Sequence, residues 1–236
     1  MESEHLLRKN AEPSAIRDAV DWRDRRAIYR NVGRSHPFIL DQLHRFLKWY
    51  EEGRYAYYSY EALARALKAE REKERSPLRI VGTVQINETG RPADVYCCYQ
   101  IPMNLLNHEI LFSQAIMKLW PYRWRRGKRV NPETRADGDL EIQTPNGPLT
   151  IYFEYVTGSQ SNRQLKARAR VYERRDDFVV WIAPDHERLD RVKWHCCGIV
   201  RAQFMLAGSD VMIDRDGDES TVDQLCGSSG EDVLQP

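Results

Sequence analysis

Two acidic residues stand beside apolar stretches in the second half of the chain. Asp137 begins one stretch, and Glu154 directly follows the apolar residues Ile151 to Phe153. A carboxylate among strand residues is costly unless it is paired, solvated or bound to a metal ion. If the two stretches form neighbouring strands, both carboxylates converge at one edge of a sheet. Their mutual repulsion there favours a cation between them.

The carboxylate pair suits one class of chemistry. Hard oxygen ligands select Mg²⁺ or Mn²⁺, and Glu109 on a preceding predicted helix is a candidate third ligand. An ion held by Asp137, Glu154 and Glu109 would polarise a phosphodiester and lower the pKa of its water. The pattern therefore predicts metal-dependent hydrolysis of phosphodiesters.

Two further acids, Asp139 and Glu141, have the same strand parity as Asp137. They alternate with apolar residues, as on a half-buried strand. The alternation favours a solvated strand face for Asp139 and Glu141 over metal ligation.

Basic residues are interleaved with aromatic residues in the segment KLWPYRWRRGKRV, 118–130. Cations there can neutralise phosphates while aromatic rings stack on bases. Strand alternation gives another interpretation, in which the aromatic rings are buried and the arginines are merely solvated. The candidate DNA contacts are Arg123, Arg125, Arg126, Lys128 and Arg129, together with Arg163, Arg168 and Arg170 of a later predicted helix.

The charges are unevenly distributed along the chain. From Ser209 onward there are eight acidic residues and one basic residue, whereas the preceding part has 35 basic and 27 acidic residues. A basic body with an acidic tail suits a protein that binds a polyanion, because lysine and arginine attract phosphates and release condensed counterions. The tail is rich in Asp, Gly and Ser, which predicts disorder.

The first elements that could position these residues lie between 36 and 101. Apolar spacing predicts a helix that includes Ile39, Leu43 and Phe46, and Ser59 is placed to cap a second helix from Tyr60 to about Glu74. The strands 78–86 and 93–101 then form a predicted hairpin. Two helices followed by a hairpin are the parts of a winged helix, which docks on DNA or on a protein partner.

Residues 102–208 have a mixed pattern. Predicted helices at 105–119, 159–174 and 185–194 alternate with predicted strands at 122–126, 140–142, 149–156, 178–183 and 199–206. The run FVVWIA, 178–183, is typical of a strand that is covered on both faces. The order predicts one domain, a sheet with helices on both sides.

At these residues the chain resembles known families. The order of elements together with Asp137 and Glu154 resembles the PD-(D/E)xK nuclease superfamily, and FEYVTG followed by RQLKARARVY is similar to its RecB-type subgroup. The stretches GRPADVYCCYQIPMNLLNHEILFSQAIMKLW, RADGDLEI and IYFEYVTGS with LKARARVY resemble the replication-relaxation family of plasmids and other mobile elements. The resemblance covers about residues 36–185. That family typically has a winged helix followed by a nuclease-like domain.

The resemblance implies roles for particular residues. It matches His108 and Glu109 to a helix motif, Asp137 with Gly138 to a D-G motif, Glu154 to the strand acid, and Tyr172 to a helix tyrosine. Ala136 stands where the family has proline, and Val156 stands where it has the lysine that positions water and stabilises developing charge. Lys166 or Arg168 on the following helix could reach the vacant place, and we predict Lys166 as the displaced base.

The sequence therefore predicts an α+β protein in four parts. These are a basic arm at 1–35, a winged helix at 36–101, a PD-(D/E)xK-like α/β domain with a mixed sheet flanked by helices at 102–208, and an acidic disordered tail at 209–236. The expected function is that of a DNA-binding protein of a plasmid or mobile element, with Mg²⁺- or Mn²⁺-dependent endonuclease activity. One alternative is a catalytically inactive accessory factor for replication or mobilisation. Another is an adaptor whose winged helix and acidic tail bind proteins.

Composition also bounds the setting of the chain. No stretch approaches the roughly 18 apolar residues of a membrane span, so we expect no membrane association. Four of the five cysteines occur as adjacent pairs, which is unlike a disulfide framework. We therefore expect a reducing, cytoplasmic environment.

Overall fold

The computed structural model describes residues 32–50, 59–85, 90–120, 124–125, 135–144, 147–158, 160–173, 178–196, 198–199 and 201–227. They form two compact units, which we call the N-terminal unit (32–120) and the C-terminal unit (124–227). The predicted basic arm lies outside the described residues except for 32–35. Among the helices described, none has the length and apolar character needed to cross a bilayer.

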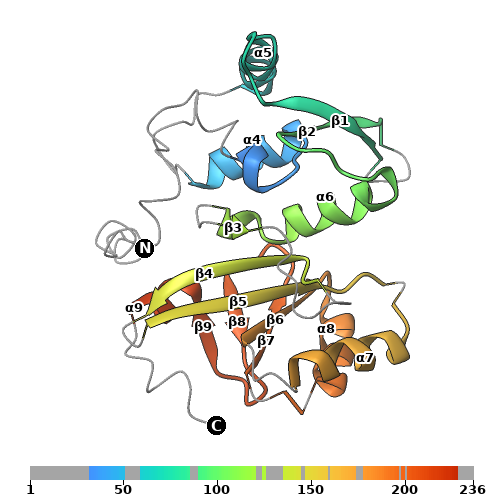
Figure 1. The fold of residues 1–236 in the computed structure, drawn as a ribbon, viewed down its shortest axis with the longest axis vertical. Coiled ribbons are helices and arrows are strands. Elements are labelled where there is room, and N and C mark those ends of the chain that lie inside the picture. Colours follow the sequence, from blue (N-terminus) through green and yellow to red (C-terminus); the bar gives the residue numbers. More distant parts are fainter. Residues whose placement is uncertain are drawn as a thin grey trace. The chain divides into compact units, whose positions relative to one another are not determined.

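The N-terminal unit combines helices with a two-stranded hairpin (Figure 1). Helices α4, Leu40–Tyr50, and α5, Tyr60–Arg71, precede the antiparallel strands β1, Arg79–Val84, and β2, Ala93–Cys97. A 3-10 turn (η1, Met103–Leu105), helix α6, Leu106–Ala115, and a second 3-10 turn (η2, Met117–Leu119) follow. The two helices and the hairpin that the sequence predicts are thus present.

Local sequence explains where these helices begin and which faces they bury. Ser59 caps α5, because its hydroxyl accepts a hydrogen bond from the backbone N–H of Ala62 at 3.2 Å. In α4 the apolar spacing places Leu43 and Phe46 in the core, where both are fully buried.

Helix α6 belongs to the N-terminal unit and not to the following domain. Its Leu106 and Ile110 share a hydrophobic core with Val84 and Val95 of the hairpin. The buried Gln42 of α4 also donates from Nε2 to the Ile110 carbonyl at 3.1 Å. The predicted boundary at 101/102 therefore differs from the observed one, because α6 completes the core of the N-terminal unit.

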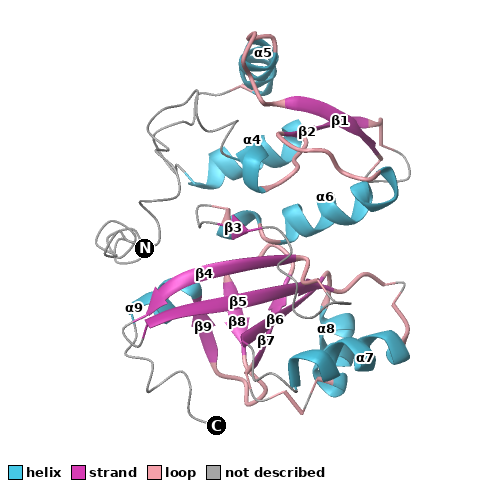
Figure 2. Cartoon of the chain, in the orientation of Figure 1, coloured by secondary structure: helices cyan, strands magenta, loops and turns pink. Residues whose placement is uncertain are grey.

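The C-terminal unit is built on a mixed seven-stranded sheet with the order β3-β4-β5-β6-β7-β8-β9. The strands are β3, Trp124–Arg125, β4, Gly138–Thr144, β5, Gly147–Tyr155, β6, Phe178–Ala183, β7, Ala202–Leu206, β8, Val211–Ile213, and β9, Glu219–Thr221. The central strands β5, β6 and β7 are parallel, and the outer pairs are antiparallel. Figure 2 shows the strands and helices of this unit.

Two crossover helices join the parallel strands. Helix α7, Asn162–Glu173, connects β5 to β6, and helix α8, His186–His195, connects β6 to β7. Their Leu165 and Leu189 share one core with Tyr152, Trp181 and other apolar residues of the central strands. All six residues of β6 are buried, as its continuous apolar run predicts.

The chain after Ser209 is a folded part of this unit, so the prediction of a disordered acidic tail is wrong for 209–227. Strands β8 and β9 extend the sheet, and helix α9, Val222–Gly227, packs against both β9 and β4. Because β4 and β9 lie near opposite edges, the sheet must be strongly curled. Residues 228–236 lie outside the described residues.

One acidic residue of this segment, Asp214, stabilises the turn between β8 and β9. One carboxylate oxygen of Asp214 accepts the backbone N–H groups of Asp216, Gly217 and Asp218 at 2.8 to 2.9 Å. Gly217 has φ +99°, a conformation that side chains disfavour. Composition alone predicted disorder because Asp, Gly and Ser are common in ordered turns as well as in disordered segments.

We predict that Met212→Ala lowers the free energy of unfolding by about 2–5 kcal/mol, because Met212 is fully buried in β8. Urea unfolding measures the change. Met103→Ala is the matched control, since Met103 is 66% exposed, and its effect should stay within about 0.5 kcal/mol. Equal, negligible effects of the two substitutions would contradict a packed β8.

Candidate functional site

Glu154 lies on β5, and Asp137 is the residue directly before β4, the strand that pairs with β5. Gly138 pairs with Phe153 in the antiparallel register, and the Asp137 N–H donates to the Phe153 carbonyl at 3.0 Å. The two carboxylates are close enough for the charge of Asp137 to act on Glu154. Asp137 is held further by its Oδ2, which accepts the Tyr155 N–H at 2.7 Å. The structure thus brings together the two acids that the sequence singled out.

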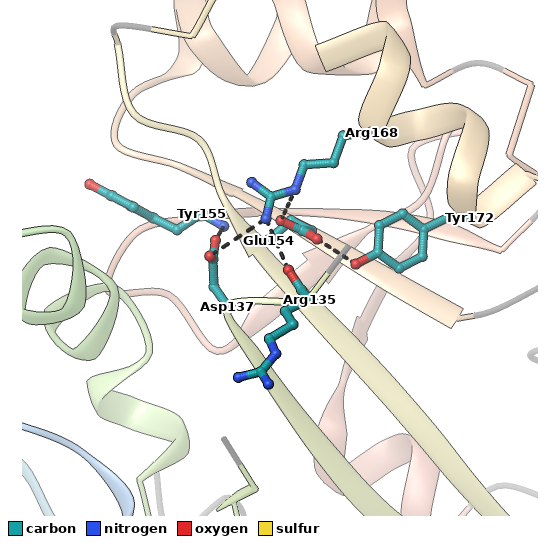
Figure 3. Close-up of polar contacts among 6 residues, drawn as sticks. All are labelled: Arg135, Asp137, Glu154, Tyr155, Arg168 and Tyr172. Carbon is teal, nitrogen blue, oxygen red and sulfur yellow. Dashed lines mark hydrogen bonds and ion pairs between the residues drawn. The ribbon is translucent and has the colours of Figure 1, made fainter. Parts of the chain in front are cut away.

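Arg168 of α7 is the cation between the two carboxylates (Figure 3). Its Nε lies 2.9 Å from Oε2 of Glu154, and its NH2 lies 3.9 Å from Oδ1 of Asp137. The same NH2 donates to the carbonyl of Arg135 at 3.0 Å. One guanidinium therefore compensates Glu154 directly, compensates Asp137 more weakly, and ties α7 to the segment that leads into β4.

Tyr172 of α7 engages the other oxygen of Glu154. Its hydroxyl donates to Oε1 of Glu154, as Figure 3 shows. The fully buried ring packs against Tyr152 at 5.9 Å and edge-on against Trp181 at 6.0 Å between centroids. This packing fixes the ring and therefore the position of its hydroxyl.

The electrostatics of the cluster are dominated by burial. Glu154 is only 1% exposed, and desolvation raises its pKa to about 8, with a further rise from the charge of Asp137. Arg168 and the Tyr172 hydrogen bond act in the opposite direction but do not outweigh these effects. Burial also raises the pKa of Tyr172, and the charge of Glu154 adds to that rise. Burial lowers the pKa of Arg168, yet Glu154 and Asp137 outweigh it and leave the pKa above its usual value.

In this arrangement a cation of the chain itself lies beside the carboxylates that were expected to hold Mg²⁺ or Mn²⁺. Both oxygens of Glu154 are engaged, one by Arg168 and the other by Tyr172. The guanidinium lies 2.9 Å from Glu154 and 3.9 Å from Asp137. Within the part of the chain that is described, no group of three or more His, Cys, Asp or Glu residues could hold a metal ion.

The predicted third ligand belongs to the other unit of the chain. Glu109, together with His108, lies on α6 of the N-terminal unit, whereas Asp137 and Glu154 belong to the C-terminal unit. Asp139 corrects another expectation, since it is fully buried and not on a solvated strand face. Glu141, on the same strand, is half-buried.

Arg168 reaches the carboxylates, whereas the sequence favoured Lys166 for that position. Lys166 is exposed on α7, and it acts electrostatically on His195 of α8. The helix itself explains the difference, because Arg168 is three residues after the buried Leu165 and four before Tyr172, on the face that meets the sheet. That periodicity was available in the sequence and would have selected Arg168.

The apolar surroundings of Val156 disfavour a lysine at this position. Val156 is buried in the core with Leu165, and its N–H donates to the Ile182 carbonyl at 2.8 Å. The end of β5 is thus part of the apolar contact with α7. A lysine there would have to bury its ammonium group in that core at high cost.

The residues predicted to contact DNA lie in different environments, and some lie outside the described residues. Arg163 and Arg170 are exposed on α7, whereas Arg168 is turned toward the carboxylates. Arg125 lies in β3, whose backbone alone is described for that residue. Arg123, Arg126, Lys128 and Arg129 lie outside the described residues.

Two backbone groups that hydrogen-bond to the site could not be predicted from the sequence. They are the backbone carbonyl of Arg135 and the backbone N–H of Tyr155. Any residue type supplies such groups, so only the tertiary register reveals them.

Comparison of the chain with protein-family models, curated proteins and solved structures found no match.

We predict that the pH dependence of stability reports the buried Glu154. A pKa raised from 4.5 to about 8 on folding means that stability is greatest at low pH and is lost as the pH rises through this interval. Relative to Glu154→Gln, the wild type should lose up to about 1.4 kcal/mol of unfolding free energy per pH unit. Urea unfolding of both proteins between pH 5 and pH 8 measures the difference, and a constant difference would contradict the raised pKa.

We also predict that removing two neighbouring cations of α7, Arg168 and Lys166, lowers the free energy of unfolding by very different amounts. Arg168→Met leaves the buried Glu154 without its cation and should cost about 3–5 kcal/mol of unfolding free energy above pH 8. Lys166→Met removes an exposed charge and should cost less than about 0.5 kcal/mol. Adding Glu154→Gln should restore much of the loss caused by Arg168→Met. Urea unfolding of the four proteins tests this, and similar losses for both single variants would refute the assignment.

Proposed function

We propose that this protein is a DNA-binding accessory factor, with a nuclease-like domain that does not cleave DNA. The observation that carries this proposal is the position of Arg168 between Asp137 and Glu154. An internal cation there neutralises the acids that would otherwise bind an ion. The loss of lysine at Val156 supports the same conclusion.

The nuclease-like class is supported by the order of elements around the two acids. A hairpin, β4–β5, carries the acids and is followed by α7 and then by β6, which is parallel to β5. This order agrees with the resemblance to PD-(D/E)xK proteins. We propose that this role belongs to the replication or mobilisation of a plasmid or other mobile element, because short motifs of the sequence resemble the replication-relaxation family.

DNA binding is supported by the outer surface of α7. This helix has four basic residues and one acidic residue. Arg163, Lys166 and Arg170 are exposed and recur at intervals of three and four, so they line one side of the helix. We call these three residues the α7 stripe. Such a stripe attracts phosphates and releases counterions.

The N-terminal unit supports the proposal in a second way. Its two helices and its hairpin, β1–β2, are the parts of a winged helix, for which we propose a docking role on duplex DNA.

A metal-dependent endonuclease is the second candidate, and one observation favours it. Asp137 and Glu154 lie close together at one end of the β4–β5 pair, as expected of a carboxylate pair that binds an ion. Activity would require Arg168 and Tyr172 to release Glu154. The residues as arranged do not meet that condition.

We predict that binding to a fluorescent DNA duplex weakens as salt rises. The triple variant Arg163→Gln, Lys166→Gln and Arg170→Gln should lose affinity and should reduce the slope of log K against log salt by up to about 2 to 3. Arg215→Gln is the matched control, because it removes an exposed charge from the turn after β8. Affinity independent of salt, or identical losses in the two variants, would contradict the proposal.

The same DNA, supercoiled and linear, distinguishes the two candidates when it is incubated with Mg²⁺ or Mn²⁺. The accessory role predicts intact DNA. Cleavage that disappears both in Glu154→Gln and with a chelator would contradict the accessory role and would support the endonuclease. Cleavage that survives both controls would come from a contaminant.

A further inference from the structure

Trp194 is the most exposed large apolar side chain in the described part of the chain. It is 78% exposed, compared with 66% for Met103, 45% for Tyr60 and 43% for Leu105. Five other tryptophans occur in the sequence, and those whose side chains are described, Trp120, Trp124 and Trp181, are buried. An indole left in water forgoes a large hydrophobic gain, which points to a partner that covers it.

Cations lie on one flank of Trp194. Asp190 and Arg191 are four and three residues before it, so they lie one helical turn away on opposite sides. Arg191 is on the side of α7, because its Nε donates to Oδ1 of Asn162 at 2.8 Å and its NH2 donates to the Gln160 carbonyl. The flank of Trp194 that carries Arg191 therefore faces the helix with the α7 stripe.

His195 adds an independent indication that these groups are close. Burial lowers the pKa of His195, and the charges of Lys166 and Arg191 lower it further. Lys166 of α7 and Arg191 of α8 thus lie within electrostatic range of the residue next to Trp194. Two cations thus lie near the exposed ring, Arg191 on its own helix and Lys166 from the α7 stripe.

We propose that Trp194 and these cations bind single-stranded DNA, with an unpaired base stacked on Trp194 and the backbone running over the α7 stripe. The inference rests on the proposed DNA binding and specifies its substrate class. An exposed ring gains stacking energy only from a base whose face is free, and the bases of a duplex are already stacked. The negative charge of Asp190 repels phosphates on the opposite flank, so the strand passes on the α7 side.

The chemistry favours DNA over a protein that would bury the indole. A hydrophobic protein patch would have to cover Lys166 and Arg191 together with Trp194, and burying unpaired charges is costly. Phosphates supply the opposite charge at a spacing that a row of basic side chains can follow.

Fluorescence anisotropy with the full chain tests this inference, with an oligo(dT) 20-mer and a hairpin duplex as probes. Trp194→Ala should weaken oligo(dT) binding about tenfold or more, while Trp194→Phe should retain most of the affinity because it keeps an aromatic face. Binding of the hairpin duplex should change less than twofold in Trp194→Ala. The slope of log K against log salt should stay at the wild-type value, because no cation is removed.

Met103→Ala is the matched control, since it removes another exposed apolar side chain and should leave both affinities unchanged. Unchanged oligo(dT) binding by Trp194→Ala overturns the inference. So does an equal loss for both probes. Self-association of the wild type that Trp194→Ala abolishes, with oligo(dT) binding intact, also overturns it and assigns the indole to a second copy of the chain. If the wild type binds neither probe, the proposed DNA binding fails as well.

Discussion

The buried pair of Glu154 and Arg168 is the constraint on which the C-terminal unit depends. A carboxylate that is almost fully buried must be neutralised, protonated or paired. Here Arg168 supplies a cation and Tyr172 supplies a hydrogen bond, both from one face of α7. The pair therefore links the β4–β5 hairpin to the helix that follows it. Hydrophobic contact alone would hold the helix but would not specify its rotation so closely.

The same helix connects the buried cluster with the proposed binding surface. As the crossover between the parallel strands β5 and β6, α7 must lie on the sheet with one face buried. The face opposite its buried residues is free for charge, and the α7 stripe occupies it. A rotation of α7 that released Arg168 would also move the α7 stripe, because both are on the same helix.

Buried polar groups also define the N-terminal unit. Gln42 accepts from the Ile39 N–H and donates to the Ile110 carbonyl, so one amide joins the start of α4 to α6. Leaving either group unpaired in this core would cost more than the net value of a hydrogen bond. This explains how α6, whose sequence suits either neighbour, becomes part of the N-terminal unit.

The sequence alone determined most of the elements and the acids at the centre of the site. Periodicity located α4 and α7, the Ser59 cap located the start of α5, and the apolar run of β6 indicated a strand covered on both sides, because all these signals are local. The sequence alone did not determine the partner of Glu154, the unit to which α6 belongs, or the folding of residues 209–227. Those outcomes depend on which distant residues meet: Arg168 reaches Glu154 only when α7 lies across β5, and α9 is stable only when the sheet curls to bring β4 to it. Burial, which decides the cost of every charge, is a property of the assembled fold.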